Sequence, residues 1–245
     1  MTQALLGTAL AAVAGVAAHR ARALSASGAI AAFAVGAIVF GSAGWRGAAV
    51  LFAFFVPSAL LSHRSTAGGP RNGRQVLANG AVAACCALLA TRFGAPLSAA
   101  FAGAFAAACA DTWGTEIGTR AAQTPVSILT FRPVAVGRSG GITPWGTLAT
   151  VGGALCVALV AAAVGVAPLL GVAAGGIAGA ALDSLLGASL QALRYCPACA
   201  RDCETLRHEC GAATQLRRGF AWMENDAVNF AATLCGAVVA ALAVR

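Results

Sequence analysis

Residues 110–118 read ADTWGTEIG, in which Asp111 and Glu116 interrupt a run of residues otherwise apolar enough to lie inside a bilayer. An acidic side chain at the centre of a membrane helix costs roughly 2.5 to 3.5 kcal/mol on insertion scales, and such groups usually face a partner, an ion or a water-filled cavity. Asp183 and Asp226 lie in or beside further apolar runs. Because isolated charges would together offset the whole stability of a small domain, we interpret these acids as one site.

The composition is typical of polytopic membrane proteins. Of the 245 residues, 59% are hydrophobic and 10% are charged, and the mean hydropathy is +0.81. Apolar windows near the length of about 20 residues that crosses a bilayer recur along the chain. We predict one integral membrane domain, residues 1–245, with an all-α fold: a polytopic bundle of about eight transmembrane helices. The predicted spans are residues 4–18, 28–44, 47–61, 76–90, 96–117, 145–164, 168–190 and 227–244.

Arginine placement predicts the topology. All sixteen cationic side chains are arginines, and only Arg46, Arg92 and Arg245 fall on one face of the eight-span arrangement. The positive-inside rule therefore predicts both termini outside and the four Arg-rich loops in the cytoplasm. We expect the membrane to be a bacterial-type inner membrane. The net charge of +8 needs no nucleic acid to explain it, although basic loops attract phosphate groups and anionic lipids. The cytoplasmic set is Arg20, Arg22, Arg64, Arg71, Arg74, Arg120, Arg132, Arg138, Arg194, Arg201, Arg207, Arg217 and Arg218.

The segment 62–80, SHRSTAGGPRNGRQVLANG, combines turn-forming glycines with positive charge. Its turns expose backbone N–H groups, and Arg71 and Arg74 flank them, so the loop could hold phosphate. An ordinary basic cytoplasmic loop would have the same composition. Gln75 and Asn79 are one helical turn apart, so both amides can point at one cavity.

The span 96–117 places Asp111 and Glu116 in its cytoplasmic half. Five residues subtend about 140° on a helix, so the two acids are not strictly on one face. Gly114 and Gly118 permit close approach or local unwinding, which would let both acids reach a common ion. The alternative is a structural aspartate paired with an arginine from another helix.

The loop 124–147 contains GRSGGIT, in which glycine amides, one cation and two hydroxyl groups can surround phosphate oxygens. It is not a Walker A sequence, because no lysine follows the glycines. Beside membrane carboxylates, phosphate binding generally needs a bridging Mg²⁺. The residues expected to contribute are Arg138, Ser139, Gly140, Gly141 and Thr143.

The last two spans carry polar groups in their cytoplasmic halves. Gly175, Gly179, Asp183 and Gly187 recur every four residues, a stripe that lets another helix approach closely with an acid set into it. At the start of the last span, Asp226 is accompanied by two amides. These amides are Asn225 and Asn229.

The predicted cytoplasmic insertion 194–218 contains YCPACARDCETLRHECG, whose Cys-x2-Cys and His-x-Cys pairs suit tetrahedral Zn²⁺. A reducing compartment disfavours disulfides, and a structural role for the metal is favoured because no open position is evident. Redox-sensing thiols and a ligand set that uses Cys203 in place of His208 are the alternatives. The preferred ligands are Cys196, Cys199, His208 and Cys210.

Six ordered blocks within residues 71–230 resemble the integral-membrane domain of unknown function 92 family, which includes a plant phytyl-phosphate kinase and animal transmembrane protein 19. The blocks are RQVLANG, ADTWGTEIG, GRSGGITPWGT, ALDSLLGASLQ, the Cys/His loop and ENDAVNF. The resemblance implies a membrane kinase that transfers a phosphoryl group, from CTP or another nucleotide, to an isoprenoid monophosphate between the helices.

The same resemblance implies roles for the residues above. Asp111, Glu116 and either Asp183 or Asp226 would hold Mg²⁺ on the nucleotide phosphates, Arg138 and the glycine amides would stabilise the transferred group, and Arg71, Arg74 or Arg132 would bind the acceptor phosphate. The other nucleotide- and phosphate-binding candidates are Asn79, Thr115, Ser139, Gly140, Gly141, Thr143, Asn225 and Asn229.

Two other classes of function stay open. Intramembrane acids also form proton relays, so a transporter or flippase of lipid phosphates or ions is the main alternative. A non-catalytic scaffold that uses the zinc loop for partners is the third. Membrane lipid is an expected partner in each reading, and a second copy of the chain, forming a homodimer, is a further candidate.

Overall fold

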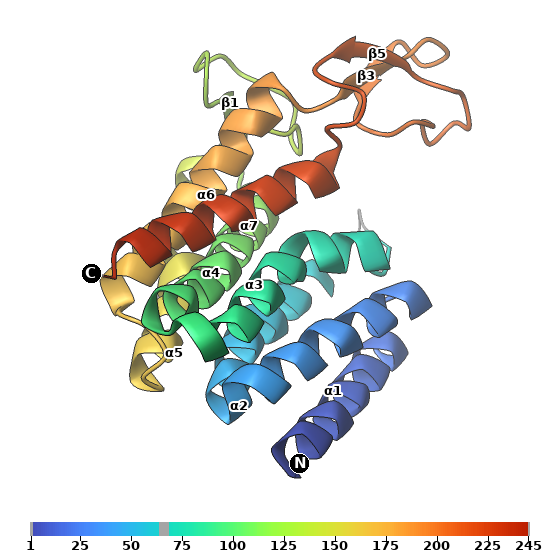
Figure 1. Cartoon of the computed structure of the whole chain (residues 1–245). Coiled ribbons are helices and arrows are strands. Elements are labelled where there is room, and N and C mark those ends of the chain that lie inside the picture. Colours follow the sequence, from blue (N-terminus) through green and yellow to red (C-terminus); the bar gives the residue numbers. More distant parts are fainter. Residues whose placement is uncertain (1, 64–68, 245) are drawn as a thin grey trace.

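The computed structural model describes residues 2–63 and 69–244, which form a bundle of seven helices with two small sheets (Figure 1). The helices are α1 (Thr2–Arg20), α2 (Ala26–His63), α3 (Gly73–Phe93), α4 (Ala95–Gly118), α5 (Pro144–Ala163), α6 (Leu169–Ser189) and α7 (Asn225–Leu242). Among the described residues, α2, α3, α5, α6 and α7 are long and apolar enough to cross a membrane. Arg64, Gly68 and Arg245, which enter the sequence predictions, lie outside the described residues.

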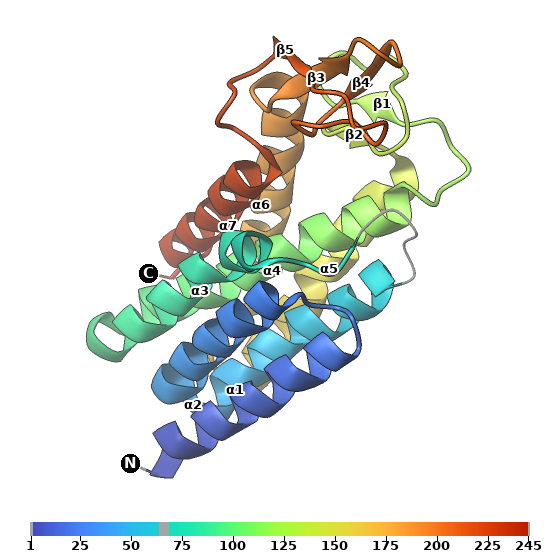
Figure 2. The same ribbon diagram turned by 90° about the vertical axis from the view of Figure 1, so that its right-hand side faces the viewer.

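The second and third predicted spans both lie within α2, which reverses direction at Gly44 (φ 60°, ψ −154°). A straight helix of 38 residues would be roughly 57 Å long. Arg71 nevertheless contacts both ends: its Nη2 donates to Ser62 Oγ at 2.9 Å, and its carbonyl accepts from Ser25 N–H at 3.0 Å. The element is therefore a helical hairpin, and its two arms run along each other in Figure 2.

The central helix is α4, and protein encloses most of its length. Residues 99–110 are all buried, and most of them are alanine. The helices α2, α3, α5, α6 and α7 pack around it, and Phe105 stacks on Phe54 of α2 with ring centroids 5.4 Å apart. Because neighbouring helices rather than lipid surround α4, its carboxyl end can carry acidic side chains that a lipid-facing helix could not.

Glycines bring α6 against α4 and α7, as the four-residue spacing predicts. A Cβ atom added to Gly175 would lie 2.5 Å from the carbonyl oxygen of Gly236, and one added to Gly179 would lie 2.6 Å from that of Ala232 and would meet Ala107. Such distances leave no room for a side chain. The predicted stripe is thus confirmed as a helix contact, and it places the carboxyl-terminal half of α6 beside that of α4.

The all-α prediction holds for the bundle but not for the connecting segments, which form two small antiparallel sheets at one end of it (Figure 2). The strands are β1 (Val126–Ser127), β2 (Gly141–Ile142), β3 (Leu193–Cys196), β4 (Arg201–Cys203) and β5 (Gln215–Arg218). In the second sheet β3 pairs with both β4 and β5. The Cys-x2-Cys segment forms the turn between β3 and β4. Strands of two to four residues are too short to show an alternating pattern, so the sequence indicates only a loop.

We predict that Gly179→Ala destabilises the protein, because the new Cβ would have to displace Ala107 and the carbonyl group of Ala232. Overpacking of this kind costs about 1–3 kcal/mol. Gly41→Ala is the matched control, because a Cβ at Gly41 meets nothing within 4 Å. Thermal unfolding in detergent should show a lower midpoint for Gly179→Ala alone, and equal midpoints would contradict the close helix contact.

Candidate functional site

Polar side chains enclose a cavity of about 320 Å³ at the end of the bundle that carries the sheets. Its walls come from α3, α4, α5, α6 and α7, from the loop before α5, from Arg71 and from Glu204. The sequence-predicted residues that line it are Arg71, Asn79, Asp111, Thr115, Glu116, Arg138, Ser139, Gly140, Gly141, Thr143, Asp183, Asn225 and Asn229. Helices and loops that are far apart in the sequence therefore converge as predicted.

Asp111 of α4 and Asp183 of α6 both line this cavity, where their carboxyl groups interact with each other electrostatically. Both residues are half-buried. Glu204 adds another negative charge within electrostatic reach of Asp183. Carboxylates this close repel each other unless a proton or a cation lies between them. The arrangement is therefore one that a divalent cation with oxygen ligands would stabilise.

Arg71 supplies a fixed positive charge beside these acids. Its guanidinium is held by Ser62 Oγ at 2.9 Å and interacts electrostatically with Glu116 and Asp111. Burial lowers the pKa of Arg71, and the two acids oppose that shift. Because arginine ordinarily titrates above pH 12, the group stays charged, and it can bind an anion next to the acidic pair.

Glu116 lies at the cavity edge and is already engaged. Its carboxylate forms an ion pair with Arg120 at 3.0 Å. Arg120 Nη2 also donates to the Leu61 carbonyl at 2.7 Å, which connects the end of α4 to the end of α2. Glu116 is consequently less available to a metal than the Asp111–Asp183 pair.

The GRSGGIT segment closes one side of the cavity by packing on the end of α6. Gly140 has φ +77°, and a Cβ there would collide with Ala188. A Cβ at Gly187 would lie 2.9 Å from the Gly140 nitrogen. Thr143 caps α5, because its Oγ1 accepts the Gly146 N–H at 3.0 Å. The glycines thus allow the loop to approach α6, while phosphate binding by their amides stays a prediction.

Glu204, which follows β4, is a cavity residue that no sequence pattern singles out. Its carboxylate accepts hydrogen bonds from Ser139 N–H at 2.9 Å and Ser139 Oγ at 2.7 Å. It also accepts one at 2.9 Å from Nε2 of Gln191, which is only 3% exposed. One glutamate therefore joins the Cys/His segment, the GRSGGIT loop and Gln191, two residues after the end of α6. In the sequence it is one acid among the charges of a polar segment.

Arg138 lines the cavity, but its guanidinium is shared with the Cys/His segment. Its Nη1 lies 3.3 Å from Asp202 Oδ2. Asp202 also pairs with Arg217 at 2.6 Å. The predicted catalytic arginine is therefore held in an ion-pair network at the cavity wall, where it can still contribute positive charge.

Three predicted residues lie outside the lining of the cavity. Arg74 is largely exposed and pairs with Asp226 at 3.5 Å and with Glu224 at 3.6 Å. Arg132 is exposed in the loop between β1 and β2. The structure thus assigns Asp226 an arginine partner at the start of α7, while Asp183 is the acid that faces Asp111.

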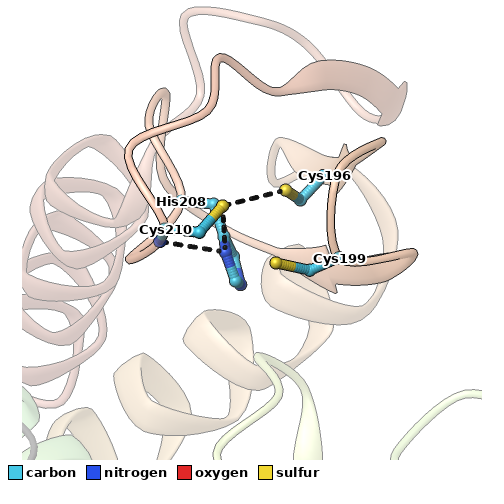
Figure 3. A group of neighbouring side chains, drawn as sticks. All are labelled: Cys196, Cys199, His208 and Cys210. Atoms are coloured by element: carbon cyan, nitrogen blue, oxygen red, sulfur yellow. Dashed lines mark hydrogen bonds between the residues drawn. The ribbon is translucent and has the colours of Figure 1, made fainter.

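The Cys/His segment brings together the four ligand atoms that the sequence favours (Figure 3). They lie within 4.8 Å of one another, and Cys210 Sγ is 3.6 Å from Cys196 Sγ and 3.2 Å from His208 Nδ1. Tetrahedral zinc with Zn–S bonds near 2.3 Å needs ligand separations of roughly 3.8 Å. The cluster therefore has a composition and spacing that could bind a metal. Its fourth member is Cys199.

Two thiols of this cluster differ in acidity. The Ala212 backbone N–H and then His208 lower the pKa of Cys210 to about 6. The hydrogen bond with Cys210 raises the pKa of Cys199 to about 11. Cys210 is therefore the more acidic thiol, and Cys199 is the neighbour that keeps its proton. Metal ions bind thiolates, so a metal bound here would displace the remaining thiol protons.

The fold and site define a class: a helical integral membrane protein with an acidic cavity at one end and a Cys/His cluster beside it. Within this class, the chain belongs to the family described as integral membrane protein DUF92, whose model matches residues 9–237. The family predicted from the six sequence blocks is confirmed.

Relatives occur in a plant, a cyanobacterium and an archaeon. Protein PGR of Arabidopsis thaliana is 28% identical over 269 residues, covering 92% of this chain and 90% of its own. An uncharacterized membrane protein of Synechocystis is 27% identical and covers 85% of this chain and 78% of its own. An uncharacterized membrane protein of Methanocaldococcus jannaschii is 29% identical, and the match covers 91% of this chain and 87% of its own. No solved structure matches the chain.

We predict that Glu204→Ala releases the GRSGGIT loop. The variant removes charge-assisted hydrogen bonds to Ser139, and such bonds contribute about 1.5–3 kcal/mol each. Hydrogen–deuterium exchange of the peptide covering residues 137–143 should accelerate by roughly tenfold or more. Glu209→Ala, which removes an exposed acid from the same segment, is the control. Unchanged protection in Glu204→Ala would show that the loop holds its place without this contact.

Proposed function

We propose that the protein is a Mg²⁺-dependent membrane phosphotransferase. It would transfer a phosphoryl group from CTP or another nucleoside triphosphate to an isoprenoid monophosphate such as phytyl phosphate. The observation that carries the proposal is the pair of facing carboxyl groups, Asp111 and Asp183, with Arg71 beside them in one polar cavity. Carboxylates for a divalent cation and a cation for phosphate are the two elements that phosphoryl transfer needs.

The cavity residues divide into two groups around the reacting phosphates. Asp111 and Asp183, with Glu116 at the edge, would hold Mg²⁺, which when bound neutralises charge on the nucleotide phosphates. Residues of the GRSGGIT loop line the same space, and Arg71 would bind the acceptor phosphate. Ser62 holds the Arg71 guanidinium in place before substrate binds, as electrostatic stabilisation of a developing charge requires.

The reaction requires positioning more than a strong base. A phosphate oxygen of the acceptor forms a bond to the γ-phosphorus of the nucleotide, and the bond from that phosphorus to the β–γ bridging oxygen breaks. The products are a nucleoside diphosphate and an isoprenoid diphosphate. Because the acceptor oxygen is already ionised near neutral pH, no hydroxyl proton has to be removed.

The arrangement supports an enzyme better than the alternative, a transporter or flippase of lipid phosphates or ions. A transporter needs polar groups that face a site near the middle of the membrane and become accessible from both sides. In α4, the central residues 99–110 are buried and include no carboxylate, arginine, lysine or histidine. The carboxylates lie instead at the end of the bundle, beside the loops.

We also propose that the seven helices cross the bilayer eight times, because each arm of α2 forms one span. The end of the bundle that carries the cavity would lie in the cytoplasm. Arg71 and Arg120 contact α2 at that end, whereas Arg46 approaches Gly165 at the opposite end. The positive-inside rule assigns the Arg-rich end to the cytoplasm. The start of α1 and the end of α7 lie away from the sheets (Figures 1 and 2), which agrees with both termini being outside.

The Cys/His cluster is proposed to bind one structural Zn²⁺ through Cys196, Cys199, His208 and Cys210. Three thiol groups and one imidazole complete a tetrahedral set and leave no position for a substrate. The metal would hold the β3–β4 turn against the segment that contains His208. It would thereby fix Glu204, which lies between these ligands in the sequence and reaches the cavity.

We predict that Asp111→Asn abolishes Mg²⁺-dependent nucleotide consumption by purified protein given CTP or ATP and an isoprenyl monophosphate. The amide removes a negative charge from the metal site without changing the side-chain size, so the fold should persist. Asp226→Asn should keep most of its turnover, since Asp226 pairs with Arg74 outside the cavity lining. Mass spectrometry of the products and a thermal unfolding scan measure both effects, and wild-type turnover in Asp111→Asn would contradict the metal role.

We predict that the protein purifies with about one Zn²⁺ per chain and that Cys210→Ser loses most of it. Cys203→Ser is the matched control, because the Cys203 thiol points to the Thr205 carbonyl and lies outside the cluster. Elemental analysis by mass spectrometry gives the stoichiometry. Zinc loss in Cys203→Ser together with retention in His208→Ala would establish the alternative ligand set.

A further inference from the structure

A second cavity, which we call the chain pocket, lies between α1, both arms of α2, α3 and Phe105 of α4. Its volume is about 70 Å³, and apart from three residues at one end its lining is apolar. Those three residues are Arg71, Gln75 and Asn79. The apolar lining is Ala11, Ala14, Gly15, Leu24, Ala32, Val35, Gly36, Phe40, Leu51, Phe52, Phe54, Phe55, Val76, Gly80 and Phe105.

The chain pocket adjoins the acidic cavity. Arg71, Gln75 and Asn79 line both spaces. The guanidinium of Arg71 is anchored by Ser62 and interacts with Asp111 on the acidic side. A single molecule with an anionic head at Arg71 could therefore extend an apolar tail into the second space.

The walls of the pocket restrict what can enter it. Water needs two to four polar partners in a buried site, and the apolar lining offers none beyond the junction. The walls approach closely where glycines occur: a Cβ at Gly36 would lie 3.0 Å from Ala11 Cβ, and one at Gly80 would lie 3.2 Å from Val35 Cγ1. An apolar space of about 70 Å³ has room for part of one hydrocarbon chain and none for the two chains of a phospholipid.

We propose that the chain pocket binds the hydrocarbon chain of a single-chain isoprenoid monophosphate while its phosphate binds at Arg71. The proposal rests on the function proposed above for the acceptor, and it adds where the chain lies: between the first three helices, and not along the outer surface of the bundle. Lipid tails are as apolar as the pocket, so moving the chain from lipid into the pocket gains little hydrophobic free energy. The role of the chain pocket is therefore to orient the phosphate toward Asp111 and Asp183.

The test is photo-crosslinking of the full chain in lipid nanodiscs with an isoprenyl monophosphate that carries a diazirine near the end of its chain. Peptide mass spectrometry should locate the label on α1 and on the two arms of α2. Ala32→Phe fills the pocket from α2 and should reduce this labelling at least about fivefold. Ala34→Phe is the matched control, because Ala34 is exposed on the same helix.

A second pair of variants guards against misfolding of Ala32→Phe. Val76→Phe narrows the pocket from α3, and Leu77→Phe changes the neighbouring exposed residue. An isoprenol with the same diazirine but no phosphate should label the pocket much less, and Arg71→Gln should reduce the label from the phosphate probe. Label confined to exposed residues, or equal label in Ala32→Phe and Ala34→Phe, would indicate bulk lipid contact and overturn the proposal.

The crosslinking result is separate from catalysis. Phosphate-dependent label in the pocket without any nucleotide consumption would support the chain pocket and contradict the kinase. Turnover of the same isoprenyl monophosphate without label in the pocket would support the kinase and contradict the chain pocket.

Discussion

Two carboxyl groups held face to face at the end of an apolar bundle, those of Asp111 and Asp183, are the constraint on which the rest of the structure depends. Each costs free energy to withdraw from water, and their mutual repulsion adds to that cost. Arg71 offsets part of the charge but is shared with Glu116. A divalent cation between the two acids would remove the repulsion and leave coordination positions for phosphate oxygens. The polar cavity around them provides the space for those oxygens.

The remaining architecture brings these groups together and keeps them there. Glycines such as Gly179 let α6 approach α4 closely enough for two acids on different helices to meet. Surrounding α4 with five other helices removes it from lipid, so its carboxyl end can be polar. At the sheet end of the bundle, Glu204 connects the GRSGGIT loop to Gln191, which follows α6. The Cys/His segment that carries Glu204 is thus part of the cavity wall as well as a candidate metal site.

Features that depend on a local sequence pattern, such as hydropathy or cysteine spacing, could be predicted from the sequence. Contacts between segments far apart in the chain could not. Hydropathy gives the helices, because a bilayer imposes one length on every span. The Cys-x2-Cys and His-x-Cys pairs predict the Cys/His cluster, because their members are close in the sequence. Asp183 and Asp226 look equivalent in the sequence, since both are acids near the end of an apolar run. Only the packing of α6 and α7 shows that Asp226 pairs with Arg74. Glu204 escapes prediction because its partners lie 65 and 13 residues away.

The central claim is that Asp111 and Asp183 hold a divalent cation that also contacts phosphate. Electron paramagnetic resonance of Mn²⁺, added in place of Mg²⁺ to the purified protein with a non-hydrolysable nucleoside triphosphate, tests it most directly. The account predicts a bound Mn²⁺ signal with phosphorus hyperfine coupling that disappears in Asp183→Asn and remains in Asp226→Asn. A signal that is independent of Asp183, or no bound Mn²⁺ in the wild-type protein, would contradict it.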